Sequence, residues 1–497
     1  MRKILQIYLL LVMGWLVTSC DSFLKEYSQD LAYANSIHDL SELLIGDGYA
    51  VTDDALLQRD ADMGYIHLMD DDIEFMLFSD LYSSVPNFGF HYWAANPYKD
   101  EISETDDPVW KWMYKRISTL NIVLAKVEDF KADDEEGYRR VKGEAHFLRG
   151  FYYFVLVNLY AKPYVRESAQ QEPGIPLKLT EYVEDNYYSR ASVEEVYQSI
   201  VSDLKRAADC LKGIEQPSLY RANVTATHAL LGRIYLYMTE WELALEQCDE
   251  ALKGNYGFMN LNTALSNVSF VNSESPEVIF SMGKSILQNS LMIYSDYDER
   301  AYIASSDLME MYDKNDLRLR FAFKEHPLAA VMGCDKLKEE DTKTVSDHFS
   351  IRLPEVYLNK AEACAMLDKG TDAVAALKLL RQNRFENGEV GDVNKQGEDL
   401  VNLIRDERRR ELCFEGHRWF DLRRYAVYPK YPMMKEIRHP YYEYDQNQYE
   451  VQYRGYYRLK PYSEDNAYVL PIPNYAIIFN NGMLKPNAER ENRMLEN

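Results

Sequence analysis

Cysteine is scarce in this sequence and is not spaced for metal or redox chemistry. The 497 residues include six cysteines, and none of them form a C-x-x-C pair. Zinc ribbons and thioredoxin-like centres depend on such pairs, so neither class of site is supported. The five cysteines after Cys20 are odd in number and irregularly spaced. We expect most of them to be buried free thiols.

Positive charge is also in short supply. The chain has 56 Lys and Arg residues against 80 Asp and Glu residues, a formal net charge of -24. A chain this acidic repels phosphates, which argues against nucleic acid or an anionic lipid surface as a partner. The composition suits a neutral or cationic ligand.

Catalytic and metal-binding motifs are missing too. The sequence has no HExxH and no GxSxG. Asp70, Asp71 and Asp72 form an acidic cluster without the ligand spacing and turn glycine of a calcium loop, so we expect a capping or solvated loop. We therefore expect no enzymatic activity, no cofactor and no metal. A secreted glycoside hydrolase remains the enzyme alternative, because its carboxylate pair is defined in space rather than in sequence.

The N-terminus lacks an apolar run long enough to span a bilayer. The run from 4 to 17 falls short of the roughly 20 residues that a membrane-spanning helix needs. It follows two basic residues and precedes Val17-Thr18-Ser19-Cys20, which is typical of a secretory signal and resembles a bacterial lipobox. We expect residues 1–19 to be a signal peptide and Cys20 to carry an anchoring lipid. The alternative is an ordinary secretory leader with a chance cysteine.

What the sequence has in abundance is helical periodicity. Apolar residues recur at helical spacing across 110–127, and residues 143–160 are apolar nearly all round, as in a buried helix. Ser192 and Glu195 predict a capping box at the start of a helix over 192–211. A mainly α-helical protein is predicted.

Two segments have the pattern of tetratricopeptide helix pairs. In 225–252, the small residues Gly232 and Ala244 would let two antiparallel helices approach closely. Residues 355–380 repeat this plan around a turn at 368–370. The two units lie far apart in the sequence, so we expect no continuous solenoid.

The segment 405–425, called the signature segment below, reads RDERRRELCFEGHRWFDLRRY. Pairs such as Glu407 and Arg410 support a helix by only about 0.2–0.5 kcal/mol each. So dense an alternation of charge instead suggests a partly buried ion-pair lattice, since Arg and carboxylate groups can be buried if every donor finds an acceptor. Gly416 is expected to end the helix. We expect this segment to be scaffold and not to touch ligand.

The signature segment closely resembles that of the SusD/RagB family of outer-membrane nutrient-binding lipoproteins. Leu470-Pro471-Ile472-Pro473 and Asn480-Asn481 resemble the C-terminal end of that family. The resemblance implies a mainly α fold, in which a tetratricopeptide-like helix-pair scaffold carries long loop and short-strand insertions. It implies one SusD-like domain over 20–497, with scaffold helices in about 110–252 and 350–425 and ligand-loop insertions in about 86–107 and 254–348.

The same resemblance implies a function. The protein would be a lipid-anchored, surface-exposed outer-membrane protein that binds an oligosaccharide or another nutrient. It would deliver this ligand to a SusC-like TonB-dependent transporter. The further alternative is an interaction protein whose helix pairs grip a partner and which has no small ligand.

Two aromatic segments are the candidate ligand site, because sugar rings stack on aromatic faces while their hydroxyls bond to polar side chains. In 91–98 the candidates are Tyr92, Trp93, Asn96 and Tyr98, and the position resembles the loop from which family members present a stacking Trp. For Trp93, core burial is an equally good interpretation. In 294–302 the candidates are Asp296, Tyr297 and Tyr302, and for each of the two tyrosines taken alone core packing is the better interpretation.

Tyrosine is unusually common, with 40 residues, and is dense over 425–462. Here 448–453 and 456–460 predict a β-hairpin that turns at Arg454-Gly455. Its tyrosines pack against the scaffold or against a partner, and the sequence does not separate these two interpretations.

Overall fold

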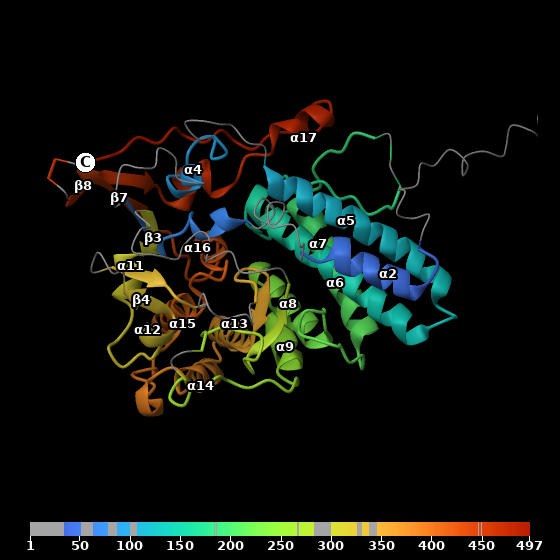
Figure 1. Ribbon diagram of the computed structural model, residues 1–497, viewed down its shortest axis with the longest axis horizontal. Helices are drawn as coiled ribbons and strands as arrows, with labels where there is room; N and C mark the ends of the chain where they lie inside the picture. Colours follow the sequence, from blue (N-terminus) through green and yellow to red (C-terminus); the bar gives the residue numbers. More distant parts are fainter. Residues whose placement is uncertain are drawn as a thin grey trace, which may run out of the picture.

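The computed structural model describes residues 34–50, 63–77, 87–99, 107–182, 184, 186–265, 268–282, 300–325, 331–336, 345–445, 447–448 and 450–497. The fold is mainly α-helical, as predicted (Figure 1). Cys20 and the predicted signal peptide lie outside the described residues. None of the helices in the described part combines the length and the apolar character needed to cross a bilayer.

The helices are α2 Ile37–Leu43, α4 Phe88–His91, α5 Pro108–Lys126, α6 Glu135–Tyr160, α7 Val193–Leu211, α8 Val224–Tyr237, α9 Trp241–Ala251, α11 Ser306–Met309, α12 Arg318–Phe321, α13 Leu353–Met366, α14 Gly370–Arg381, α15 Gly397–Leu412, α16 Arg418–Ala426 and α17 Asn474–Phe479. Shorter helical turns are η2 Leu44–Gly48, η3 Gly64–His67, η4 Val127–Phe130, η5 Glu386–Gly388, η6 Tyr462–Glu464 and η7 Asn466–Tyr468. The strands are β1 Ile73–Leu77, β2 Val278–Ser281, β3 Arg300–Ala304, β4 Phe323–Glu325, β5 Met332–Cys334, β6 Ser350–Arg352, β7 Ile437–Asp445 and β8 Glu450–Leu459.

Helices α5, α6 and α7 pack side by side at one end of the molecule (Figure 1). The predicted capping box is confirmed, since the Ser192 hydroxyl accepts from the Glu195 backbone N–H and the Glu195 carboxylate reaches back to the Ser192 N–H. The α6 residues from 143 to 160 are all buried. The periodicity of the sequence therefore located this layer correctly.

Both predicted helix pairs are present, as α8 with α9 and α13 with α14. A Cβ added at Gly232 would lie 3.0 Å from the Cys248 sulfur, so the small residue permits the close approach that the sequence predicted. Helix α13 packs against α9 and joins the two pairs, and Lys360 of α13 lies 2.6 Å from Asp249 of α9. The two units thus form one scaffold although about a hundred residues separate them in the sequence.

The ion-pair lattice predicted for the signature segment is confirmed. Glu411 of α15 lies 2.9 Å from Arg384, 3.1 Å from Arg318 and 3.3 Å from Arg352. Glu277 bridges two of these arginines, at 2.7 Å from Arg384 and 2.9 Å from Arg352. These side chains are at most 1% exposed, so the lattice is central to the core. It holds α15 against segments that come from three other parts of the chain.

A four-stranded sheet in the order β3-β1-β7-β8 lies at the other end of the molecule, with α4 beside it (Figure 1). Strand β1 pairs antiparallel with β3 and parallel with β7, and β7 pairs antiparallel with β8. The predicted turn at Arg454-Gly455 is wrong, because β8 runs through both residues and the connection lies between Asp445 and Glu450. Gly455 instead sits at a β-bulge, where an added Cβ would lie 2.2 Å from the Glu496 carbonyl oxygen.

The prediction that most of the five cysteines are buried free thiols is confirmed, since four are buried and Cys210 is half-buried; the buried ones are Cys248, Cys334, Cys364 and Cys413.

The acidic cluster at 70–72 was expected to form a capping or solvated loop, and the expectation of solvation is wrong. All three carboxylates are buried, and they meet the signature segment, since Asp71 lies 2.7 Å from Arg418 and Asp72 lies 2.7 Å from Arg409.

Candidate ligand-binding site

The loop 87–99, which lies between β1 and α5 in the sequence, folds back on itself. The Ala94 N–H donates to the Gly89 carbonyl at 2.8 Å, and a Cβ added at Gly89 would lie 2.7 Å from the Pro97 carbonyl oxygen. Asn87, which precedes α4, has a left-handed backbone with φ of 60°. The loop is therefore a compact unit with an inner and an outer side.

Trp93 lies on the inner side. Its backbone is left-handed, with φ of 54°, and this turns the indole into the protein, where its exposed fraction is 0%. The indole N–H donates to the Met69 carbonyl at 2.8 Å, and the ring stacks on His439 at 4.2 Å. The structure corrects the prediction of Trp93 as a stacking residue for ligand, because neither face of the ring is open.

Tyr98 and Asn96 occupy the second turn of the loop and are half-buried. The Tyr98 hydroxyl donates to Asp107, as does the Tyr160 hydroxyl, while the side-chain Oδ1 atom of Asn96 accepts from the Tyr98 N–H at 3.2 Å. Burial raises the pKa of Asp107 to about 6, although the hydrogen bonds from Tyr160 and Tyr98 favour its charged form. Tyr98 thus ties the loop to the start of α5, where Asp107 also caps the helix.

The second predicted segment contributes no surface that the structure describes. Asp296 and Tyr297 lie outside the described residues. Tyr302 of β3 is only 7% exposed, and its ring packs at 5.3 Å from Phe75 and 5.4 Å from His91. The prediction of Tyr302 as a ligand residue is corrected, since the strand turns this side chain under α4.

Two buried histidines support the loop from below. His91 and His439 stack at 4.1 Å, and both are 1% exposed. The His439 ring nitrogens lie 2.7 Å from the carbonyl oxygens of His91 and of Asp70. Burial lowers the pKa of His91, and it lowers that of His439 to about 4 against the two hydrogen bonds. These rings fix the loop to β7 and do not reach a ligand.

Four aromatic rings, called the aromatic patch below, lie on the outer side of the loop and on the adjoining sheet face. They belong to Phe88, Tyr92, Tyr441 and Tyr457, and each residue is half-buried. The Phe88 centroid lies 5.3 Å from that of Tyr92 and 6.0 Å from that of Tyr441. Tyr457 lies 5.0 Å from Tyr92 and 6.0 Å from Tyr441. The patch is a contiguous surface of ring faces and edges.

Along strand β7, the residues on the face of the aromatic patch become more exposed with distance from α4. His439 is buried, Tyr441 is half-buried and Glu443 is exposed, and alternate residues of a strand share one face. Gln452 stands opposite Glu443 across the ladder, and the Arg454 guanidinium lies 3.0 Å from the Glu443 carboxylate. Glu443, Gln452 and Arg454, called the polar rim below, therefore place hydrogen-bonding groups beside the aromatic patch.

The structure thus brings together only part of the predicted site. Tyr92 lies in the aromatic patch, whereas Trp93 and Tyr302 lie beneath it. The predicted set lacks Tyr441 and Tyr457, which come from the tyrosine-rich segment whose role the sequence left open. The alternation of β7 and β8 would have pointed to them, but the misplaced turn obscured it.

The helix pairs, with their loop and sheet insertions, form a mainly α-helical scaffold rather than a continuous helical solenoid. The sequence model of the SusD family matches residues 333–489, and a second model, described as "Starch-binding associating with outer membrane", matches residues 65–236. The chain is therefore similar to the SusD family over two separate stretches.

Relatives and solved structures agree with this similarity. SusD-like protein P2 of Formosa agariphila is 24% identical over 372 residues, which is 63% of this chain and 70% of the relative. SusD-like protein P25 of the same organism is 22% identical over 82% of this chain and 87% of its own length. A SusD superfamily protein from Bacteroides thetaiotaomicron has a TM-score of 0.69 at 21% identity, covering 91% of this chain and all of its own. A SusD-like carbohydrate binding protein from Bacteroides vulgatus has a TM-score of 0.67 at 20% identity, covering 90% and 97%. At these identities the solved structures establish a shared fold.

Proposed function

We propose that the protein binds a neutral oligosaccharide across the aromatic patch and the polar rim. The observation that carries this proposal is the contiguous set of four half-exposed rings at 5.0–6.2 Å, flanked by an amide, a carboxylate and a guanidinium. Pyranose rings offer apolar C–H faces to aromatic side chains and hydroxyls to polar ones. The family description and the printed name of one structural neighbour, a carbohydrate binding protein, support the same ligand class.

The charge of the site favours a neutral ligand. Burial raises the pKa of Tyr457 from 10 to about 12, so its hydroxyl stays uncharged well above neutral pH. The chain as a whole is strongly acidic, at -24, and repels sulfated or uronic-acid polymers at long range. A neutral glycan avoids this repulsion.

The experiment is a calorimetric titration of the chain from Asp21 with a panel of oligosaccharides. Tyr457→Ala should lose about 1–3 kcal/mol of binding free energy, by analogy with the stacking of nucleobases on aromatic side chains. Tyr453→Ala is the matched control. Tyr453 lies on the same strand, is 53% exposed, and pairs with Tyr442 on the opposite face of the sheet.

A panel member that binds both variants equally well would refute the placement of the site. A far-ultraviolet spectrum and a melting temperature for each variant separate lost stacking from lost folding. The length of the glycan should be unchanged after incubation, because the proposed function is binding without cleavage. Release of shorter products would favour the glycoside hydrolase alternative.

We further propose that the protein is held on the outer membrane by a lipid on Cys20 and passes its ligand to a SusC-like TonB-dependent transporter. The family description places its members at the outer membrane. Helix α17 adds an observation, because Ile478 is 69% exposed, Phe479 74% and Met483 53%. Grouped exposed apolar side chains are typical of contact surfaces.

Co-purification from detergent-solubilised membranes tests this second proposal. Phe479→Ser should reduce the recovery of a transporter, whereas Leu265→Ser, which changes an equally exposed leucine elsewhere, should not. Mass spectrometry of the mature N-terminus should find an acylated Cys20. Recovery of a transporter by a protein without any glycan affinity would favour the pure interaction protein instead.

A further inference from the structure

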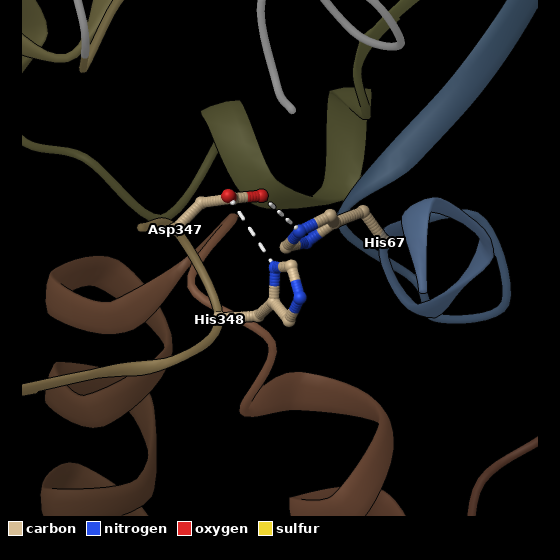
Figure 2. Close-up of side chains that lie close together, drawn as sticks. All are labelled: His67, Asp347 and His348. Atoms are coloured by element: carbon tan, nitrogen blue, oxygen red, sulfur yellow. Dashed lines mark hydrogen bonds and ion pairs between the residues drawn. The ribbon is translucent and has the colours of Figure 1, made fainter. Parts of the chain in front are cut away.

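Three side chains that could ligate a metal ion meet in the core, away from the aromatic patch. His67 comes from η3, and Asp347 and His348 come from the segment before β6 (Figure 2). The His67 Nε2 atom lies 2.7 Å from Asp347 Oδ2, and the His348 Nδ1 atom lies 3.4 Å from Asp347 Oδ1. Each of these side chains is at most 1% exposed. One ligand atom of each residue lies within 4.8 Å of the other two.

His348 is the anomaly of this cluster. Within the part of the chain that the structure describes, neither of its ring nitrogens has a hydrogen-bond partner. Buried polar atoms are nearly always hydrogen-bonded, because an unmet donor or acceptor pays its full desolvation penalty. Figure 2 shows the Nδ1 edge of this ring turned toward the Asp347 carboxylate. At 3.4 Å the Nδ1 atom faces the carboxylate at ion-pair distance without a hydrogen bond, and a cation bound between the two groups would satisfy both.

The segment that carries His348 is held firmly in place. A Cβ added at Gly416 would lie 2.7 Å from the His348 Cβ, so the glycine of the signature segment makes room for this histidine. The Ser346 N–H donates to Ser281 at 2.8 Å, and the Phe349 N–H donates to Ser346 at 3.0 Å. These contacts fix the backbone from which the His348 side chain projects.

We propose that His67, Asp347 and His348 bind one divalent transition-metal ion, of which Zn²⁺ is the representative. Two imidazole nitrogens and one carboxylate oxygen form a donor set that Zn²⁺ and its neighbours in the first transition row accept. Ca²⁺ and Mg²⁺ favour oxygen ligands throughout, so they fit this set poorly. A water molecule completes a tetrahedral site with three protein ligands.

The observed distances agree with an ion-free form of such a site. Zn²⁺ lies about 2.0–2.2 Å from nitrogen and oxygen ligands, which sets neighbouring ligand atoms of a tetrahedron about 3.3 Å apart. The 3.4 Å separation of His348 Nδ1 from the carboxylate already fits. The 2.7 Å contact of His67 is a direct hydrogen bond that the ion would replace, with a widening of about half an ångström.

The ion would act as a structural cross-link. His67 lies six residues before β1, which is a central strand of the four-stranded sheet, whereas the 345–349 segment leads through β6 into α13 of the scaffold. One ion would thus join the sheet insertion to the helix pairs, across 280 residues of sequence. This inference does not depend on the proposed glycan function.

The test uses full-length mature protein without a histidine tag. After treatment with a chelator and its removal, the protein is titrated with Zn²⁺ in a calorimeter, and metal content is measured on the re-dialysed sample. We expect one ion per chain and a rise in melting temperature with Zn²⁺, because a ligand that binds only the folded state stabilises it. Ca²⁺ at the same concentration should produce neither effect.

Two variants locate the ion. His348→Gln should lower Zn²⁺ affinity at least tenfold and abolish the thermal shift, whereas His228→Gln, which changes a half-buried histidine on α8, should leave both unchanged. Equal binding by the His348→Gln variant would place the ion elsewhere and overturn the proposal. If this variant does not fold, the chelated wild-type protein decides, because failure to take up one tightly bound ion overturns the proposal by itself.

Discussion

Trp93→Ala is expected to cost several kcal/mol of folding stability. The indole is 0% exposed, so its removal opens a cavity in the core, and Trp→Ala replacements in cores cost about 3–5 kcal/mol. The replacement also removes the donor to the Met69 carbonyl, a further penalty of roughly 1–3 kcal/mol if that oxygen is left unmet in the core. Typical domains are stable by only about 5–15 kcal/mol, so the variant should be marginal.

Trp93→Phe separates the two contributions. Phenylalanine keeps most of the ring volume and the stack on His439, but it cannot donate to Met69. We expect it to lose about 1–3 kcal/mol, mainly from the unmet carbonyl. Urea unfolding followed by far-ultraviolet circular dichroism measures both losses, with a common slope as the check for two-state behaviour.

Ligand affinity provides the decisive contrast. In the folded fraction, Trp93→Phe should bind the glycan like the wild type, because the indole lies beneath the aromatic patch rather than in it. If Trp93→Ala instead lost less than about 1 kcal/mol of stability while abolishing glycan binding, the indole would be a ligand platform. Our assignment of Trp93 to the core would then be refuted.

The buried charges give two more predictions. Glu411→Gln should destabilise the protein by about 3–5 kcal/mol, because it leaves Arg318, Arg352 and Arg384 in the core with one carboxylate fewer, and denaturant unfolding measures the loss. The second concerns Asp107, whose folded pKa of about 6 exceeds the ordinary 3.8. The folded chain therefore binds a proton there that the unfolded chain has released, so the contribution of Asp107 to stability should fall by about 3 kcal/mol as the pH rises from about 4 to about 6. Asp107→Asn should remove this fall from the stability profile. An unchanged profile would contradict the assignment.

Local signals made most of the scaffold predictable. The Ser192–Glu195 capping box and the small residue at Gly232 act over one helical turn or one helix pair, so they can be read without knowledge of the rest of the fold. The alternating charges of the signature segment were enough to predict that it forms an ion-pair lattice. Its partners, such as Glu277 and Arg352, could not be assigned, because they come from distant segments.

The candidate site was less predictable for the same physical reason. The direction of the Trp93 side chain depends on a left-handed backbone and on contacts with Met69 and His439, one of which is more than 300 residues away. Gly455 carries the same local signal whether it forms a turn or a bulge, and only the approach of the C-terminal Glu496 decides between them. The periodicity of the sequence does not specify these long-range contacts.

The signature segment does not contact the aromatic patch, yet it positions the strand on which the patch depends. Arg409 and Arg418 hold the buried carboxylates of Asp72 and Asp71, and the chain continues directly from these residues into β1. Phe75 of β1 then packs at 5.1 Å from Phe88 and stacks at 6.4 Å on Tyr441, two members of the aromatic patch. Because interiors are close-packed, a shift of β1 would be transmitted to both rings. The arginines therefore fix the geometry of the patch from beneath.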